Sequence, residues 1–336
     1  MTERAAKALA FLSRAGWAGA RREALAGDAS NRRYERLTRP GSGRTAILMD
    51  APAERGEDVR PFVRIARFLR GAGLSAPEII ASDAENGFLL LEDLGDDLFA
   101  RVIPRNPRLE PLLYETATDV LVALHEVAPP PDLGTYDPSL MTDLSALAFD
   151  RYRIGITGLP DPALREAFVV AFRPLLEAVM RGVAPVLIQR DYHAENLLWL
   201  PQRAGIARVG LLDFQDAMLG HPAYDLVSLS QDARRDVPRE IEAAMIARYA
   251  ARTGRERAEL EAACAVLGAQ RNLRILGVFA RLSLDSGKPH YVDLIPRVWG
   301  LLQRDLAHPA LAPVAGLVRR ELPEPTPGNL QRLRRT

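Results

Sequence analysis

Cysteine is almost absent from this chain of 336 residues. The one cysteine, Cys264, lies in an Ala-rich apolar pattern of helical spacing. A single thiol can form neither a disulfide framework nor a cysteine-based zinc site within one chain. The simplest setting for such a sequence is a reducing one, so we expect a cytoplasmic protein.

Long apolar runs and an excess of one charge are missing as well. No segment approaches the roughly 20 apolar residues that span a bilayer, and residues 1–14 lack the apolar core of a signal peptide. The 44 Lys and Arg nearly balance the 43 Asp and Glu, with a formal net charge of +1. We therefore expect neither a membrane nor a nucleic-acid partner, and nothing indicates an obligate protein partner.

The first 95 residues have the pattern of a small β-rich lobe. Strong turn signals, such as Pro40-Gly41-Ser42-Gly43 and Asn86-Gly87, separate short strand-like segments. The predicted strands are residues 22–25, 33–37, 45–49, 77–81 and 88–91, and the predicted helices are residues 3–15 and 59–71. A chain of this length exceeds the usual single domain, so a second lobe is expected.

From residue 96 onward, apolar residues recur mainly at helical spacing. Helices are predicted over residues 109–124, 140–152, 162–180 and from 238 to the Pro-rich tail. Two short apolar runs interrupt them and are expected to pair as an inserted β-hairpin. The prediction is an α+β fold with two lobes, residues 1–95 and residues 96–336, joined by a hinge at residues 92–97.

Three oxygen-bearing side chains follow these two apolar runs. Residues 186–188 lead into Asp191 and Asn196, and residues 209–212 lead into Asp213. Carboxylate and amide oxygens at the ends of adjacent strands can hold Mg²⁺ and orient an attacking hydroxyl. We therefore predict a phosphoryl-transfer site with Asp191 as the base and Asn196 and Asp213 as magnesium ligands. The plain alternative is that all three only cap turns.

The same segments carry a known motif. Residues 189–196, Gln-Arg-Asp-Tyr-His-Ala-Glu-Asn, resemble the H-G-D-x-H-x-x-N loop of the aminoglycoside phosphotransferase and choline kinase-like family. Residues 213–217, Asp-Phe-Gln-Asp-Ala, resemble its I-D-W-E-D-A segment, and residues 220–226 resemble its G-x-P-x-x-D-L continuation. The order of the lobes agrees too, so the resemblance covers most of the chain.

The resemblance implies a protein kinase-like fold that uses ATP and Mg²⁺. Residues 189–196 and 270–277 are most similar to members that phosphorylate bacterial amino sugars during cell-wall recycling. This resemblance therefore implies a small amino-sugar substrate, N-acetylmuramate or N-acetylglucosamine, which is phosphorylated on its anomeric hydroxyl. The alternatives are a kinase for an aminoglycoside, choline or homoserine, and a kinase-like module that binds nucleotide without catalysis.

Several positions depart from the family pattern. Gln189 and Arg190 replace the first His and the Gly of the loop, and Met49 stands where many relatives place a phosphate-pairing Lys. The following helix also lacks a Glu at its centre that could pair with such a Lys. The two absences go together, because a buried Glu without the Lys would carry an uncompensated charge. The candidates for the cation that meets the ATP phosphates instead are Arg32, Arg33 and Arg44.

Two further segments are candidates for nucleotide binding. Ser30, Asn31 and the backbone of their turn can face phosphate, although a plain hairpin turn explains this segment equally well. Glu92 and Leu94 lie where a hinge backbone can pair with adenine. Their backbone, and not their charge, would make that contact.

Substrate contacts are expected from the helical lobe, in addition to Asp191. A lactyl carboxylate calls for an arginine, ideally a bidentate one, and the alternative for each candidate is a solvated helix face. The candidates are Gln231, Asp232, Arg234, Gln270 and Arg274. His193 and Asp225 are predicted to support the catalytic loop, Asp225 through backbone hydrogen bonds or as a helix cap.

Overall fold

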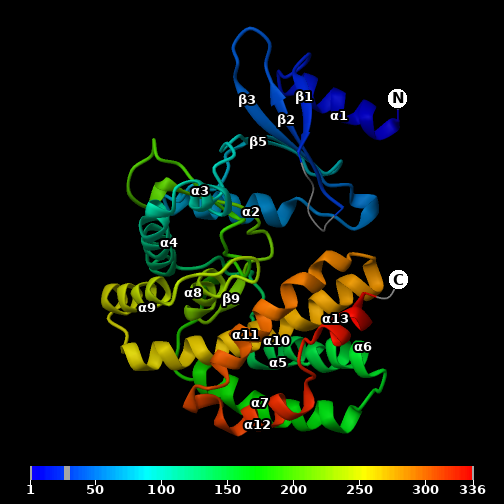
Figure 1. Ribbon diagram of the computed structural model, residues 1–336. Coiled ribbons are helices and arrows are strands. Elements are labelled where there is room, and N and C mark those ends of the chain that lie inside the picture. Colours follow the sequence, from blue (N-terminus) through cyan, green and yellow to red (C-terminus); the bar gives the residue numbers. More distant parts are fainter. Residues whose placement is uncertain (1, 26–30, 335–336) are drawn as a thin grey trace. The chain divides into compact units, whose positions relative to one another are not determined.

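The computed structural model describes residues 2–25 and 31–334 (Figure 1). Contacts within the chain divide it into two compact units. Unit 1 is Met1–Val127 with Ala194–Ala217, and unit 2 is Ala128–His193 with Met218–Thr336. Asp191 therefore belongs to unit 2, whereas Asn196 and Asp213 belong to unit 1. The sequence predicts two lobes, residues 1–95 and 96–336, and these do not coincide with the two contact units. The lobe boundary near residue 95 stays a prediction.

Unit 1 is built on a five-stranded antiparallel sheet with the order β1-β2-β3-β5-β4. Its strands are β1 (Arg21–Leu25), β2 (Arg33–Thr38), β3 (Thr45–Asp50), β4 (Ile79–Asp83) and β5 (Phe88–Glu92). The helices of unit 1 are α1 (Glu3–Arg14), α2 (Arg60–Gly71), α3 (Phe99–Arg105) and α4 (Glu110–His125). All five predicted strands are confirmed, each within two residues of its predicted ends.

One face of this sheet packs against α1. Leu48 of β3 pairs with Leu90 of β5 in the sheet, and both lie in one buried cluster with Phe11 of α1. Phe11 stacks on Phe88 with 5.7 Å between the ring centroids. Because side chains alternate along a strand, Met49 points to the opposite face from Leu48. The part of this face that α1 covers is therefore apolar, and this burial favours one register of the sheet.

Unit 1 also contains a short hairpin of β7 (Leu197–Trp199) and β8 (Val209–Leu211). Ser75 holds its second strand and the turn before it. The carbonyl of Ser75 accepts the N–H of Leu211 at 3.0 Å, and its hydroxyl donates to the carbonyl of Ala207 at 2.7 Å. These two hydrogen bonds thus fix β8 and the turn before it within unit 1.

Unit 2 is mainly helical (Figure 1). Its helices are α5 (Pro138–Ser145), α6 (Ile154–Thr157), α7 (Pro162–Met180), α8 (Ala223–Ser230), α9 (Arg239–Thr253), α10 (Arg257–Ser286), α11 (Ile295–Asp305), α12 (Ala312–Glu321) and α13 (Pro327–Leu333). The predicted helix over residues 140–152 is interrupted, because α5 ends at Ser145 and a π-helical turn follows at Ala148–Arg153.

The predicted single hairpin around residues 189–196, here called the catalytic segment, is wrong in its pairing. β6 (Val186–Ile188) pairs with β9 (Met218–Gly220), whereas β7 pairs with β8. The two apolar runs that the sequence places in one hairpin therefore belong to different two-stranded sheets. The catalytic segment connects β6 to β7, and the segment with Asp213 connects β8 to β9.

Helix α10 is the longest helix described in unit 2, with 30 residues. Two glycines allow close packing along it. A Cβ on Gly277 would lie 2.5 Å from the carbonyl oxygen of Leu147, and a Cβ on Gly268 would lie 2.5 Å from Oδ2 of Asp305. Glycine disfavours a helix interior by about 1 kcal/mol relative to alanine, so these two positions are explained by packing.

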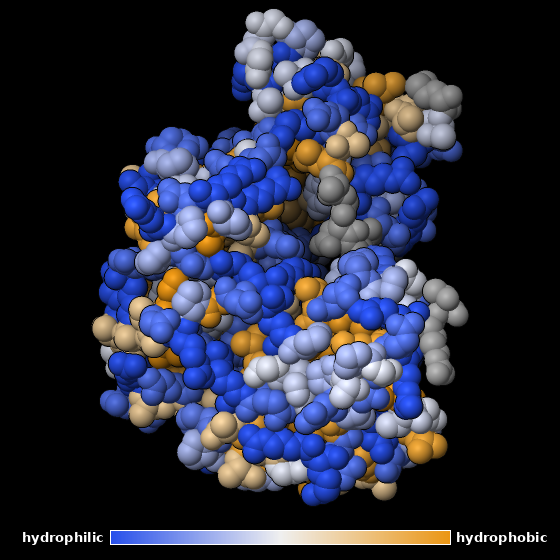
Figure 2. All heavy atoms as spheres, in the orientation of Figure 1, coloured by the Kyte–Doolittle hydropathy of each residue, from blue (hydrophilic) through white to orange (hydrophobic). Residues whose placement is uncertain are grey.

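The surface is predominantly polar on the face shown in Figure 2, with apolar residues between the charged ones. Among the helices described, none combines the length and the apolar character that crossing a bilayer requires.

Candidate active site

The catalytic segment leaves β6 through a backbone clamp in unit 2. Asp225 of α8 is fully buried and accepts the backbone N–H of Gln189 at 2.6 Å and that of Arg190 at 3.0 Å. Arg190 has a left-handed backbone with φ 72, and its carbonyl accepts the hydroxyl of Ser228 at 3.2 Å. Hydrogen bonds therefore hold both the N–H and the carbonyl of Arg190, the residue directly before Asp191.

The clamp depends on an unusual carboxyl group. Burial raises the pKa of Asp225 to about 7, although the two backbone N–H donors act in the opposite direction. The nearby charge of Asp191 raises this pKa further. Ionisation of Asp225 is thus sensitive to pH near neutrality, unlike that of an ordinary aspartate.

Asp191 is half-buried, and arginines of α10 lie within electrostatic range of it. Burial alone would raise the pKa of Asp191, but the nearby basic groups, Arg274 first and then Arg271, His193 and Arg190, together lower it. Asp191 is consequently ionised at neutral pH. A carboxylate in this state can orient a hydroxyl and accept its proton as a bond to phosphorus forms.

His193 is buried beside two of the predicted substrate residues. Its Nε2 lies 3.4 Å from Nη1 of Arg234, and the backbone N–H of Arg234 donates to Oδ1 of Asp232 at 2.8 Å. Burial lowers the pKa of His193 to about 4, although Asp232 acts in the opposite direction. The imidazole is therefore neutral at pH 7, which suits a hydrogen-bonding role in the loop better than attraction of a phosphate.

Tyr136 joins the catalytic loop to α10, and sequence reasoning missed it. The Arg190 guanidinium lies over its ring, 5.4 Å from the centroid, and Nε2 of Gln270 donates to its hydroxyl at 3.2 Å. The hydroxyl of Tyr224 donates to the same oxygen at 3.4 Å. No motif surrounds Tyr136, and the only available signal is an aromatic residue in a polar loop.

Arg274 belongs to the same group of residues. Burial would lower its pKa, but Tyr224, Tyr136 and Asp191 raise it above the ordinary value. Its charge is therefore permanent, and it lies within electrostatic range of the base.

Gln231 is placed differently from the other substrate candidates. Its Nε2 donates to Oδ1 of Asp305 at 2.9 Å, and its Oε1 accepts Nδ2 of Asn272 at 2.8 Å. Asn272 also donates to Oδ2 of Asp305 at 3.0 Å. Both ends of the Gln231 amide are thus engaged in a fully buried network, which favours a structural role for this residue.

The metal-ligand candidates lie together in unit 1. Nδ2 of Asn196 donates to Oδ2 of Asp213 at 3.4 Å, and the carbonyl of Asn196 accepts the N–H of Leu212 at 3.0 Å. Nε2 of Gln215 donates to the other oxygen of Asp213 at 2.7 Å. Asp213 has φ 56, a left-handed conformation that aspartate tolerates better than most residues.

This arrangement fits Mg²⁺ shared with a nucleotide. No cluster of three or more His, Cys, Asp or Glu side chains in the described part of the chain could hold a metal ion by itself. Mg²⁺ usually takes one or two protein carboxylates and completes its shell with phosphates and water. Asp213 and the amide oxygen of Asn196 are residues of the right type for such a partial shell.

Aromatic packing anchors the loop of Asp213 to α2. Phe214 and Phe62 are buried, with 4.8 Å between their ring centroids. Met49 on β3 is 1% exposed, and α2 contains no acidic residue. The structure therefore has a buried methionine and a helix without acidic residues where the family pattern places a Lys and Glu pair.

Two of the predicted phosphate-binding residues, Asn31 and Arg32, bind the same carboxylate. Nε of Arg32 donates to Oε2 of Glu57 at 2.8 Å, and the backbone N–H of Asn31 donates to Oε1 of Glu57 at 3.1 Å. Arg33 and Arg44 are exposed, and Ser30 lies outside the described residues. The carboxylate of Glu57 thus binds both Asn31 and Arg32, just before the start of β2.

The hinge candidates differ from one another. The N–H of Glu92 donates to the carbonyl of Glu78 at 2.8 Å, and its carboxylate accepts Nη2 of Arg203 at 2.5 Å. Within the described residues, the backbone of Leu94 makes no hydrogen bond. Leu94 is therefore the better placed of the two to meet an adenine edge.

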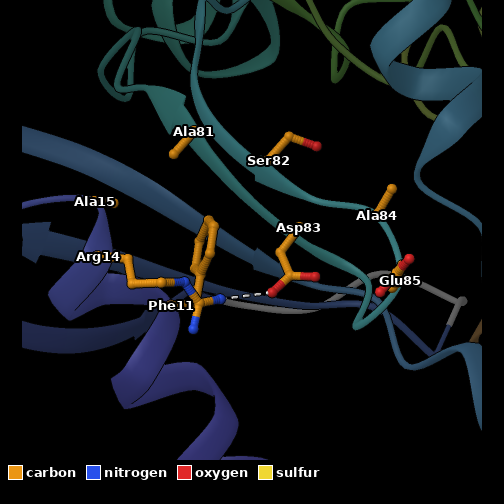
Figure 3. A pocket seen from close by; sticks show the side chains of 8 residues that line it. All are labelled: Phe11, Arg14, Ala15, Ala81, Ser82, Asp83, Ala84 and Glu85. Carbon is orange, nitrogen blue, oxygen red and sulfur yellow. Dashed lines mark hydrogen bonds and ion pairs between the residues drawn. The ribbon is translucent and has the colours of Figure 1, made fainter.

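A pocket of about 380 Å³ lies between α1 and the end of β4 (Figure 3). Arg14 and Asp83 face each other across it and form an ion pair at 2.8 Å. Its remaining lining residues include Phe11 and Ala81 but no residue of 189–196 or 213–226. The pocket is therefore separate from the candidate active site.

Known proteins with a similar sequence are phosphotransferases, as the spacing of Asp191, Asn196 and Asp213 in the sequence predicts. Residues 21–263 match the model of the phosphotransferase enzyme family, APH. The chain belongs to this family, and it is an enzyme that transfers a phosphoryl group to an alcohol acceptor.

A similar curated relative is the N-acetylmuramate/N-acetylglucosamine kinase of Caulobacter vibrioides. The two chains are 42% identical, and the match covers 97% of this chain and 98% of the relative.

Solved structures show the same two-lobed, protein kinase-like fold. A choline/ethanolamine kinase family protein from Mesorhizobium loti has a TM-score of 0.63 at 17% identity, covering 94% of this chain and 99% of that one. An ADP-bound aminoglycoside phosphotransferase has a TM-score of 0.57 at 14% identity, covering 84% and 92%. The predicted fold class is thereby confirmed.

Proposed function

We propose that this enzyme transfers the γ-phosphoryl group of ATP to the anomeric hydroxyl of N-acetylmuramate or N-acetylglucosamine, in recycling of cell-wall sugars. The observation that carries the proposal is the catalytic carboxylate. Asp191 is ionised, and the residues before it are held by Asp225. The relative that covers nearly the whole chain supports the choice of acceptor.

The nucleotide would be held by unit 1. Asp213 and Asn196 would hold Mg²⁺ through their side-chain oxygens, and the ion would supply positive charge to offset that of the phosphates. The backbone of Leu94 would pair with adenine. The ADP in an aminoglycoside phosphotransferase of the same fold supports a nucleotide of this kind.

The acceptor would be bound by unit 2. The oxygen of the anomeric hydroxyl attacks the γ-phosphorus, the bond from that phosphorus to the bridging β–γ oxygen breaks, and ADP leaves with the electron pair. Asp191 orients the hydroxyl and accepts its proton, late in a loose transition state. The products are ADP, a sugar 1-phosphate and one proton.

Charge distinguishes this acceptor from the cationic ones considered as alternatives. Three arginines of unit 2, Arg190, Arg271 and Arg274, lie within electrostatic range of Asp191. A polycationic aminoglycoside or choline would be repelled by them, whereas a neutral or anionic sugar would not. This arrangement favours the amino sugars.

The experiment is product identification. The purified protein is incubated with ATP, Mg²⁺ and each of N-acetylmuramate, N-acetylglucosamine, choline, homoserine and an aminoglycoside, and the product is assigned by phosphorus-31 NMR. We expect phosphate on C1 of the two sugars. Asp191→Asn should lose at least about 100-fold in kcat, whereas Asp143→Asn, at an exposed position on α5, should keep wild-type activity. Phosphate on C6, or on a non-sugar acceptor only, would refute the proposal.

A further inference from the structure

Arg271 is a buried cation with unused donors. It is 4% exposed, and its Nε and Nη1 have no hydrogen-bond partner among the described residues. A buried guanidinium normally directs its N–H groups at carboxylates, carbonyls or water. Leaving such donors unpaired is costly, so Arg271 is a candidate for a ligand that supplies the missing acceptors.

The position of Arg271 connects it to the acceptor side of the reaction. It follows Gln270, whose Nε2 binds the hydroxyl of Tyr136, and Tyr136 also carries the Arg190 guanidinium on its ring. Arg271 is within electrostatic range of Asp191 and His193. It therefore lies in the cluster that surrounds the catalytic carboxylate.

Other buried polar atoms of this cluster also lack partners within the described residues. They are Oε1 of Gln270, Oδ2 of Asp232 and Nε2 of Gln189. Two of these atoms are acceptors and suit hydroxyl or amide N–H donors of a sugar. The set combines an anion-binding fork with acceptors for neutral groups, which is the recognition pattern of a polar ring that bears one carboxylate.

We propose that Arg271 binds the lactyl carboxylate of N-acetylmuramate and sets the preference of the enzyme for this sugar over N-acetylglucosamine. The proposal rests on the proposed function. The two sugars differ at O3, where only N-acetylmuramate carries the lactyl acid, so a residue that binds this group acts on one substrate alone. Arginine suits the role because its planar fork matches a carboxylate with two parallel hydrogen bonds.

N-acetylglucosamine leaves this guanidinium without its partner. Hydrogen bonds to charged groups contribute about 10- to 100-fold in affinity, so we expect a preference of this size for N-acetylmuramate in kcat/KM. The preference should reside mainly in KM, because the lactyl group takes no part in the bond changes at phosphorus.

The test changes the arginine and the carboxylate independently. Arg271→Gln, Arg271→Lys and the control Arg281→Gln, which alters an exposed arginine of the same helix, are assayed with N-acetylmuramate, its lactyl amide and N-acetylglucosamine. We expect Arg271→Gln to lower kcat/KM for N-acetylmuramate by about 10- to 100-fold and for the other two acceptors by less than about threefold. Arg271→Lys should fall between wild type and Arg271→Gln, and Arg281→Gln should match wild type.

The outcomes separate this proposal from its rivals. An equal loss of kcat with all three acceptors would assign Arg271 to positioning Asp191 and overturn the proposal, as would no loss with any of them. Thermal unfolding of each variant, and the retained activity of Arg271→Gln on N-acetylglucosamine, exclude misfolding as the cause of a selective loss. If wild type phosphorylates neither sugar on C1, the proposed function fails and this inference fails with it.

Discussion

The backbone N–H of Arg190 donates to the buried carboxylate of Asp225 at 3.0 Å, while Arg190 itself has φ 72. The family motif has glycine at this position, and the left-handed backbone explains the glycine. A non-glycine residue in this conformation costs about 1–2 kcal/mol. In this chain the carboxylate of Asp225 and the ring of Tyr136 hold the arginine in place.

Arg190→Gly is therefore expected to leave the free energy of unfolding within about 1 kcal/mol of wild type. The relief of backbone strain is offset by the lost cation–π contact, about 0.5–1 kcal/mol, and by the greater freedom of glycine in the unfolded chain. Arg190→Val should be at least about 2 kcal/mol less stable than Arg190→Gly, because a β-branched side chain tolerates this backbone poorly. Urea unfolding at pH 7 measures both variants, and equal stabilities would contradict the backbone explanation.

The sequence was sufficient for the elements that repeat a local pattern. Alternation and turn residues located all five strands of the sheet, and apolar spacing located α1, α2 and α7. The pairing of β6 with β9 was missed because the paired residues of 186–188 and 218–220 are 30 to 34 positions apart, and short apolar runs carry no information about their partner.

The site shows the same division between local and non-local information. Asp191, Asn196 and Asp213 stand in motifs whose spacing is visible in the sequence. Tyr136 and Arg271 are brought to the cluster around Asp191 by packing of distant segments against α10. Their residue types are unremarkable where they stand. Only the folded chain reveals the contacts of Tyr136, or that Nε and Nη1 of Arg271 lack partners among the residues that the structure describes.

Gln215→Glu should make the loop of Asp213 dependent on magnesium. Gln215 donates a hydrogen bond to Asp213 at 2.7 Å, and a glutamate at this position would place a second carboxylate there. Repulsion and the lost donor are expected to cost about 1–2 kcal/mol of stability without metal, and Mg²⁺ with ADP should restore most of this loss. Thermal unfolding with and without Mg²⁺ and ADP tests the effect, with Gln215→Met as the uncharged control. A loss of stability in Gln215→Glu that magnesium leaves unchanged would oppose a metal at Asp213.

Met49→Lys should destabilise the chain and not improve nucleotide binding. Met49 is 1% exposed, and α2 has no acidic residue to pair with a lysine. An unpaired buried charge is expected to cost about 3–5 kcal/mol, whereas Met49→Leu should cost less than about 1.5 kcal/mol. Urea unfolding compares the two variants, and titration with ADP and Mg²⁺ measures the affinity. A lysine variant as stable as the leucine variant would show that a counter-charge reaches this position.

Asp305 gives stability a pH dependence that one substitution should remove. Burial raises its pKa from 3.8 to about 8, although Arg304 and the amide donors of Gln231 and Asn272 act in the opposite direction. The folded state therefore binds one more proton than the unfolded state between about pH 4 and pH 8. The stabilisation is fully present below the unfolded pKa and is lost as the pH rises through the folded pKa, at about 1.4 kcal/mol per pH unit between pH 5 and pH 7.

Asp305→Asn has no proton to lose, so its stability relative to wild type should rise with pH. Between pH 5 and pH 7 the difference in unfolding free energy, variant minus wild type, is expected to increase by about 2–3 kcal/mol. Groups that titrate alike in both proteins cancel in this difference. Urea unfolding at half-unit pH steps gives the two curves, and Asp285→Asn, at an exposed position near the end of α10, is the control that should run parallel to wild type. Parallel curves for Asp305→Asn as well would mean that Asp305 is ionised in the folded protein, with the amides of Gln231 and Asn272 compensating its charge.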